Sequence, residues 1–214
     1  MKQLMALFPY NVLLIIVGAV ELAKWLLYLL HKSTIQVFNH RARANVKMDL
    51  DWGQKFGLMP RRLPKKIRHK SVLFHCASMG EVTATIGLIR EILKQHPEHY
   101  VVVTTNTLTG KHQLQRRLSD EMGKRVFHTY LPIDLPWMMS ALLRQVKPVV
   151  TLIMEVELWP NLIRKCRAKK IPVVVVNARM TDKTKRGYQR FSWLSGQMIK
   201  SLSKVLARNQ DDFD

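Results

Sequence analysis

A serine and a glutamate three residues apart, Ser78 and Glu81, are the first candidates for chemistry in this sequence. Ser-x-x-Glu is the pattern of a helix capping box, in which the two side chains satisfy free backbone N–H groups at the start of a helix. An acid at the start of a helix also interacts favourably with the helix dipole. Ser78 and Glu81 can therefore serve the helix alone, or Glu81 can also do chemistry.

Further polar residues recur along the chain, each group directly after a short apolar run. Taken singly they have structural explanations, because threonine-rich loops cap helices and a proline such as Pro160 suits a first helical turn. A metal site is not expected, because no histidines stand at ligand spacing beside the acids. The groups are Ser78, Gly80 and Glu81; Thr104, Thr105, Asn106 and Thr107; Asp134; Glu155 and Glu157; and Asn177 and Arg179.

The elements that must position these residues are short apolar runs alternating with amphipathic stretches, from residue 71 onwards. Such alternation predicts a Rossmann-like α/β fold, with a parallel sheet covered by helices on both faces. The residues after each strand of such a sheet gather at one edge, where ligands bind. The predicted strands are Ser71–Cys76, His99–Thr105, Arg125–Tyr130, Val149–Glu155, Pro172–Asn177 and Lys204–Arg208, and the predicted helices are Glu81–Lys94, Gly110–Leu118, Leu135–Val146, Pro160–Ala168 and Gly187–Ser201.

The composition narrows the class of function. A chain of 214 residues holds one α/β core with an appendage, and its formal charge of +20 indicates a polyanionic neighbour. Nucleic acid is disfavoured, because the basic clusters have few interleaved aromatics and no nucleic-acid-binding motif is present. The GxSxG, GxGxxG and Walker patterns are absent too, which argues against hydrolase, dinucleotide-binding and P-loop functions.

An apolar stretch from Leu4 to Leu30 precedes the core and is followed by basic residues. About 20 apolar residues can cross a bilayer, and positive residues beside them mark the cytoplasmic side and attract anionic lipid. We therefore expect a membrane-anchor helix in residues 1–32, either spanning or in the membrane plane, then a basic juxtamembrane segment in residues 33–70 and the Rossmann-like domain in residues 71–214. A helix buried in an oligomer is the alternative to the anchor. The second basic cluster comprises Arg61, Arg62, Lys65, Lys66, Arg68 and Lys70.

Five motifs follow one another through the predicted sheet: HCASMGE, TTNTLTG (Thr104–Gly110), YLPIDLP (Tyr130–Pro136), MEVELWPN (Met154–Asn161) and NARMT (Asn177–Thr181). In this order and spacing they resemble the 3-deoxy-D-manno-octulosonic acid (Kdo) transferases of Gram-negative lipopolysaccharide synthesis. The resemblance implies a two-domain GT-B glycosyltransferase, of which this chain is the amino-terminal, acceptor-binding half. The carboxy-terminal, donor-binding domain is then absent, and the chain alone is expected to be inactive.

By this resemblance Glu81 is the general base and Glu155 stabilises the transition state. The implied reaction is inverting: the base takes the proton of the 6′ hydroxyl of a lipid A precursor, lipid IVA, whose oxygen attacks Kdo as CMP leaves CMP-Kdo. No cofactor is implied, and the expected location is the cytoplasmic face of the inner membrane. The alternatives are a non-catalytic membrane-bound binding module and a GT-B transferase for another nucleotide sugar. The expected acceptor-binding residues are Ser78, Gly80, Thr105, Thr107, Asp134, Glu157, Asn161, Asn177 and Arg179.

Overall fold

The computed structural model describes residues 7–20, 22–23, 52–56, 63–155, 157–179, 185–186, 188–189 and 192–208. The chain divides into two compact units, Met1–Asp49 and Leu50–Asp214. In the first unit residues 7–20 and 22–23 are helical and carry exposed apolar side chains, among them Phe8 and Leu13. Within the described residues, no helix combines the length and the apolar character needed to cross a membrane. Arg61, Arg62 and most of the predicted basic segment lie outside the described residues.

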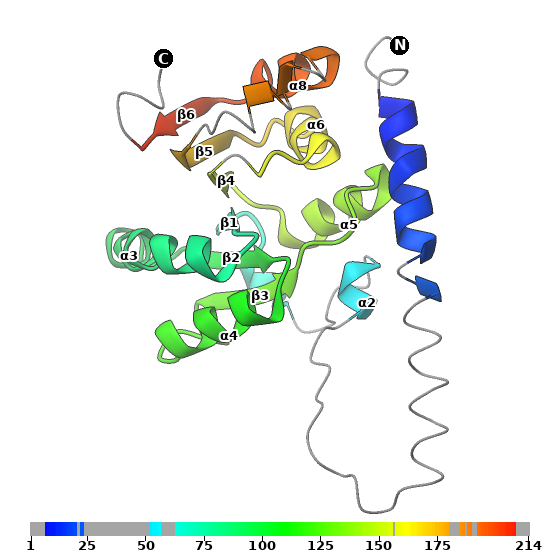
Figure 1. The fold of residues 1–214 in the computed structure, drawn as a ribbon. Coiled ribbons are helices and arrows are strands. Elements are labelled where there is room, and N and C mark those ends of the chain that lie inside the picture. The colour runs from blue at the N-terminus through cyan, green and yellow to red at the C-terminus, as the bar shows by residue number, and fades with distance from the viewer. Residues whose placement is uncertain are drawn as a thin grey trace, which may run out of the picture. The chain divides into compact units, whose positions relative to one another are not determined.

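The second unit is built on one six-stranded sheet in which all paired strands are parallel, in the order β3-β2-β1-β4-β5-β6 (Figure 1). This order confirms the predicted Rossmann-like sheet. Each strand lies within a residue or two of its predicted position, because continuous runs of Val, Ile and Leu mark a fully buried parallel strand clearly. The strands are β1 (Ser71–His75), β2 (Tyr100–Thr105), β3 (Val126–Tyr130), β4 (Val150–Met154), β5 (Val173–Ala178) and β6 (Lys204–Ala207).

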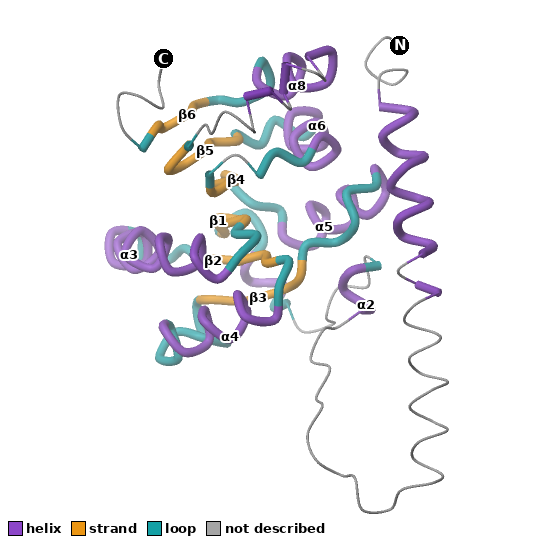
Figure 2. Tube along the Cα trace, in the orientation of Figure 1, coloured by secondary structure: helices purple, strands orange, loops and turns teal. Residues whose placement is uncertain are grey.

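Helices cover both faces of the sheet, as Figure 2 shows. One buried cluster packs α3 and α4 against the sheet, and a second packs α5, α6 and α8. The alternation along β1 explains both, because Val72 and Phe74 belong to the first cluster and Leu73 to the second. The helices are α3 (Met79–Gln95), α4 (Leu108–Arg117), α5 (Pro136–Val146), α6 (Pro160–Ala168) and α8 (Ser192–Ile199), the last shorter than its predicted range.

The second unit begins at Leu50, earlier than the domain start predicted at residue 71. The described residues before 71 include a short helix, α2 (Trp52–Lys55), and a 3₁₀ turn, η1 (Lys65–Ile67). Gln54 of α2 accepts hydrogen bonds at its Oε1 from the Thr129 hydroxyl and the Tyr130 N–H, both at 2.9 Å. Ile67 is fully buried in the core. A four-residue helix is too short to show a hydrophobic period, so the sequence pattern did not separate it from the basic segment.

Candidate active site at the carboxyl edge of the sheet

The order of the strands creates a topological switch point at the carboxyl edge, between β1 and β4, where open α/β sheets have their ligand crevice. From β1 the chain moves to β2 and β3 on one side, whereas β4 leads to β5 and β6 on the other. The connections after β1 and β4 therefore diverge, and ligands of open α/β sheets bind at such a switch point. Glu81 comes after β1 and Glu155 directly follows β4. The topology thus brings the two predicted catalytic carboxylates to the two sides of one crevice.

Glu81 is fixed by a complete capping arrangement at the start of α3. The Ser78 Oγ accepts the Glu81 N–H (3.3 Å) and donates to the Glu81 Oε1 (2.8 Å). The Ala77 N–H donates to the other carboxylate oxygen, Oε2, at 2.8 Å. The side chain is only 7% exposed. The capping role expected of this pair is therefore confirmed, and the cap also fixes the direction of the carboxylate.

The pKa of Glu81 is raised above its ordinary value, chiefly by burial of the carboxyl group. The hydrogen bonds from Ser78 and Ala77 lower this pKa in part, and the nearby negative charge of Glu155 raises it further. A carboxylate with a raised pKa holds an accepted proton more strongly than an ordinary one. The environment of Glu81 thus favours proton transfer as well as capping.

A third carboxylate, Glu157, belongs to the same group. Its pKa is raised by burial first, then by the charges of Glu81 and Glu155. We name these three residues, Glu81, Glu155 and Glu157, the carboxylate cluster. Tyr188 lies close enough to Glu157 for that charge, added to burial, to raise the tyrosine pKa to about 12. Tyr188 had not been predicted as a site residue, because it follows no strand and stands in no motif.

The backbone at two of these strand ends adopts a left-handed conformation. Glu155 has φ 53° and Asn177 has φ 55°, and the Glu155 N–H donates to the Val176 carbonyl at 2.9 Å. Asparagine tolerates this region, whereas for glutamate it costs on the order of 1 kcal/mol. Strain held by strand pairing beside a charged crevice is typical of functional sites.

Asp134 and Asn161 are both fully buried and bind each other's segments. The two carboxylate oxygens of Asp134 accept the N–H groups of Asn161 and Leu162, each at 2.8 Å, and the Asn161 side-chain amide donates to the Asp134 carbonyl. Asp134 therefore caps α6 from the loop after β3. This burial argues against the predicted contact of the two residues with the acceptor substrate. Their role is instead to position the start of α6 against the loop after β3.

The threonines after β2 divide into a buried and an exposed residue. Thr105 is fully buried; its Oγ1 donates to the Thr107 carbonyl (3.2 Å) and bonds the Nε2 of His128 (2.9 Å). Thr107 is exposed and caps α4 by accepting the Gly110 N–H at 3.1 Å. Thr105 consequently shapes the loop, and Thr107 remains accessible from solvent.

The remaining predicted residues lie at the surface or partly buried. Gly80 is exposed, and a Cβ there would stand 3.8 Å from the Ser78 Oγ, an ordinary contact, so there is space beside Glu81. Arg179 is exposed directly after β5, while Ser78 and Asn177 are half-buried.

Two further residues at this edge had escaped prediction, His75 and Trp159. The Trp159 Nε1–H donates to the His75 Nε2 (2.8 Å), and the His75 Nδ1 bonds the Thr104 Oγ1 (3.0 Å). Since the Thr104 hydroxyl donates to the Phe74 carbonyl, it accepts from Nδ1, and His75 is neutral. Burial and the charge of Lys55 lower its pKa to about 3. The ring thereby ties the ELWPN motif to β1.

Lys55 is the fourth unpredicted residue and comes from α2. Its Nζ donates to the Asn106 carbonyl at 3.1 Å and lies 5.8 Å from the centre of the Tyr130 ring. Burial lowers its pKa. A cation from far upstream in the sequence thus reaches the loop after β2 at the carboxyl edge.

A comparison with known families identifies the fold and its motifs. The family model described as 3-deoxy-D-manno-octulosonic-acid transferase (kdotransferase) matches residues 50–214. The chain belongs to the Kdo transferase family. This confirms the resemblance predicted from the five motifs, and the match begins at the residue where the second compact unit begins.

Individual relatives agree with the family assignment. The chain is 34% identical over 140 residues to a 3-deoxy-D-manno-octulosonic acid transferase of Haemophilus influenzae, covering 65% of this chain and 32% of the relative. It is 31% identical over 159 residues to a probable mitochondrial Kdo transferase of Arabidopsis thaliana, covering 73% and 32%. A Kdo transferase of Rickettsia typhi is 29% identical over 183 residues, covering 85% and 36%. The matched region spans about a third of the length of these Kdo transferases.

Proposed function

We propose that this chain is the acceptor-binding and general-base half of an inverting glycosyltransferase that moves Kdo from CMP-Kdo to the lipid A precursor lipid IVA. The proposal extends the printed activity of its relatives to this chain. The observation that carries it is the position of Glu81. This capped carboxylate with a raised pKa stands at the switch point of a parallel sheet, close to Glu155.

A purely structural role for Glu81 accounts for less of the arrangement. Capping needs one carboxylate, and the Ser78 hydroxyl and Ala77 N–H satisfy it. The charge of Glu155 is unfavourable to that cap, because a like charge near a partly buried carboxylate raises the pKa of Glu81. The charges of Glu81 and Glu155 raise the pKa of Glu157 in the same way. A cluster that opposes its own stability is typical of a catalytic site.

In the proposed mechanism the chain holds and activates the acceptor. Glu81 takes the proton of the acceptor's primary hydroxyl, and the oxygen then attacks the anomeric carbon of Kdo while the bond to CMP breaks. Gly80 leaves space for the hydroxyl to approach, and Ser78 keeps the carboxylate directed. Glu155 stabilises charge that develops in the transition state. Exposed Thr107 and Arg179 are candidates for polar contacts to the acceptor.

The decisive experiment replaces the base in a full-length, two-domain form of the protein. Glu81→Gln keeps the size of the side chain and its acceptor oxygen but removes the proton acceptor. We expect transfer of radiolabelled Kdo to fall by about 10²–10⁴-fold. Glu91→Gln, on an exposed turn of the same helix, is the matched control and should keep full activity. Undiminished transfer by the folded Glu81→Gln protein would overturn the proposal.

We further propose that the protein works at the cytoplasmic face of the inner membrane. The support is the apolar stretch Leu4–Leu30, whose described helical residues expose Phe8, Leu13 and Ile16, together with the high positive charge. Exposed apolar side chains beside cations suit an anionic lipid surface. Flotation with vesicles of anionic and of neutral lipid tests this. Binding to neither kind of vesicle would contradict it.

A further inference from the structure

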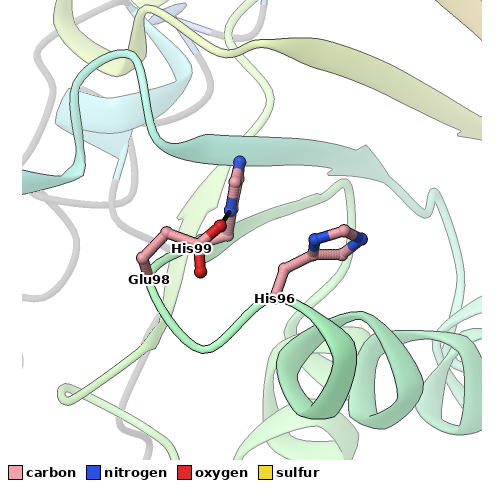
Figure 3. A group of neighbouring side chains, drawn as sticks. All are labelled: His96, Glu98 and His99. Atoms are coloured by element: carbon pink, nitrogen blue, oxygen red, sulfur yellow. Dashed lines mark ion pairs between the residues drawn. The ribbon is translucent and has the colours of Figure 1, made fainter.

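Two histidines and a glutamate meet in the turn that joins α3 to β2, at the amino edge of the sheet. His96, Glu98 and His99 each offer a ligand atom, and these atoms all lie within 4.8 Å of one another. Figure 3 shows Glu98 and His99 in contact, with the ring of His96 beside them. The Glu98 Oε1 is 2.5 Å from the His99 Nδ1, and the two imidazole rings are 5.3 Å apart.

The turn that carries these side chains is held rigidly. The His99 N–H donates to the His96 carbonyl at 3.0 Å, which closes a four-residue β-turn with Pro97 at its second position. Proline fixes the backbone torsion that this position requires. The first and fourth residues of a β-turn lie close together, so the two histidines are brought together by the backbone itself.

An arginine that directly precedes β3, Arg125, holds the same turn through hydrogen bonds to its backbone. The Arg125 Nη2 donates to the carbonyls of Leu93 (2.8 Å), His96 (2.9 Å) and His99 (3.3 Å). The guanidinium is thus engaged by backbone oxygens rather than by the Glu98 carboxylate. Its positive charge opposes a bound cation, and the Glu98 carboxylate offsets it. The backbone at His96 and at His99 is therefore held in place before any ligand binds.

We propose that His96, Glu98 and His99 form a binding site for a zinc ion, separate from the carboxylate cluster. Two imidazole nitrogens and one carboxylate oxygen are ligands that zinc prefers, and a solvent molecule can complete a tetrahedral set. Tetrahedral zinc places its ligand atoms about 3.4 Å apart. The three ligand atoms, all within 4.8 Å of one another, are already near this spacing.

Binding also requires a change of proton position at His99. The Nδ1 now faces the Glu98 oxygen, and a metal there must take the place of a proton. A neutral ring moves that proton to Nε2, and a protonated ring releases it to solvent.

The proposed site lies at the C-terminal end of α3, the helix whose first turn carries Glu81. His96 is the C-cap of α3, and His99 immediately precedes β2. A metal that joins these residues joins the end of α3 to the start of a central strand. We therefore expect zinc to protect the turn and the last turn of α3 from hydrogen exchange.

Equilibrium dialysis of the tag-free full chain against zinc tests the site, with magnesium and calcium as comparison ions. One zinc per chain is expected, together with preference over both oxygen-seeking cations. His96→Ala, His99→Ala and Glu98→Gln should each weaken binding by about tenfold or more. His112→Ala and Glu91→Gln, which change a histidine and an acid outside the turn, are the matched controls and should bind as the wild type does.

Cobalt provides an independent readout, because a tetrahedral cobalt complex with nitrogen ligands absorbs visible light. This absorption should appear in the wild type and in both controls and disappear in His96→Ala. Circular dichroism establishes that each variant is folded. Absence of zinc binding by the wild type would overturn the proposal, as would unchanged binding by the double variant His96→Ala/His99→Ala.

Discussion

The two edges of the sheet differ in how they use charge and strain. The carboxyl edge buries acids and histidines, with Glu81 and Glu157 raised in pKa and His75 lowered. A cavity of about 530 Å³ at the amino edge is lined by cations instead, among them Arg144 and Lys147. Most of these lining cations are exposed to solvent, whereas the acids and His75 at the carboxyl edge are buried or half-buried.

Backbone strain occurs at both edges and so does not identify the site by itself. His69, Lys147 and Lys170 have positive φ at the amino edge, as Glu155 and Asn177 have at the carboxyl edge. Lys147 is the C-cap of α5, a position where the left-handed conformation ends many helices. The carboxyl edge is distinguished by the combination of strained backbone with interacting carboxylates that are buried or half-buried. Substitutions at the two edges should therefore have different effects.

The largest expected effect is on catalysis by Glu155→Gln in the full-length protein. In the proposed mechanism the Glu155 charge stabilises the transition state, so its loss should lower transfer by about 10²-fold. The same change removes a charge that raises the Glu81 pKa, so the acid limb of the pH–rate profile should move to lower pH. Lys147→Gly, at the amino edge, is the control for a change at a residue with positive φ. An unshifted pH–rate profile would show that the Glu155 charge does not affect Glu81, and would contradict the view that the carboxyl edge is distinguished by interacting carboxylates.

The second effect is a loss of stability in mild acid. Burial lowers the folded-state pKa of both His75 and His128 to about 3, whereas an unfolded histidine titrates near 6.5. The unfolded chain therefore binds protons first as the pH falls, and stability is lost from about pH 7 downwards. From pH 7 to pH 5 each histidine should cost about 2 kcal/mol in the free energy of unfolding, measured with urea.

A variant isolates the histidine contribution from that of the acids. The raised pKa values of Glu81 and Glu157 act in the opposite direction, since their contribution to stability is lost as pH rises. His128→Gln should remove about half of the histidine-linked loss, and exposed His112→Gln should leave the loss unchanged. If the free energy of unfolding depended on pH equally in both variants, burial of His128 would not control the protonation of that residue.

The third effect concerns the residues that position the site. Asp134→Asn replaces a carboxylate that accepts two backbone N–H groups at α6 with an amide, whose NH₂ group is a donor and cannot accept one of them. Leaving a buried donor unsatisfied costs about 1–3 kcal/mol. Asp120→Asn, on an exposed turn, is the matched control and should be nearly neutral. Similar unfolding free energies for the two variants would contradict the positioning role.

The smallest effect is expected at the amino edge. Lys147→Gly relieves a left-handed conformation that costs a residue with a Cβ atom, while it adds freedom to the unfolded chain. The net change should be a stabilisation of at most about 1 kcal/mol, observed as a small rise in the urea midpoint. A large loss of stability would show that the half-buried lysine side chain stabilises the fold by more than its left-handed backbone costs.

The regular elements were the most predictable part of the molecule. Runs such as Tyr100–Thr105 are apolar on both faces, which few structures other than a buried parallel strand accommodate. The carboxyl-edge position of Glu81 and Glu155 followed from those runs. Those runs did not predict which side chains face solvent. Thr105 and Asp134 were expected to contact the acceptor substrate and are fully buried. A strand end can be located by composition, whereas the neighbours that bury it come from elsewhere in the chain.

Some residues gave no signal in the local sequence. Lys55 precedes the sheet by many residues and reaches its edge only because Gln54 docks α2 on β3. The turn at His96–His99 joins a predicted helix to a predicted strand, and its residues are not among the site residues expected from the sequence. Its ligand geometry depends on the hydrogen bonds from Arg125, which is distant in sequence. Such contacts are set by packing between segments, and no pattern within one segment encodes them.

The amino-acid sequence by itself determined the alternation of strands and helices, the family and the carboxyl-edge order of the polar motifs, since each depends on hydrophobic period or on residue type. Only the tertiary structure decided which of those polar groups are buried, how they alter one another's protonation and which distant side chains join them. The physical reason is that burial and Coulomb interaction depend on distance in space, and the folded sheet sets that distance between segments far apart in the chain.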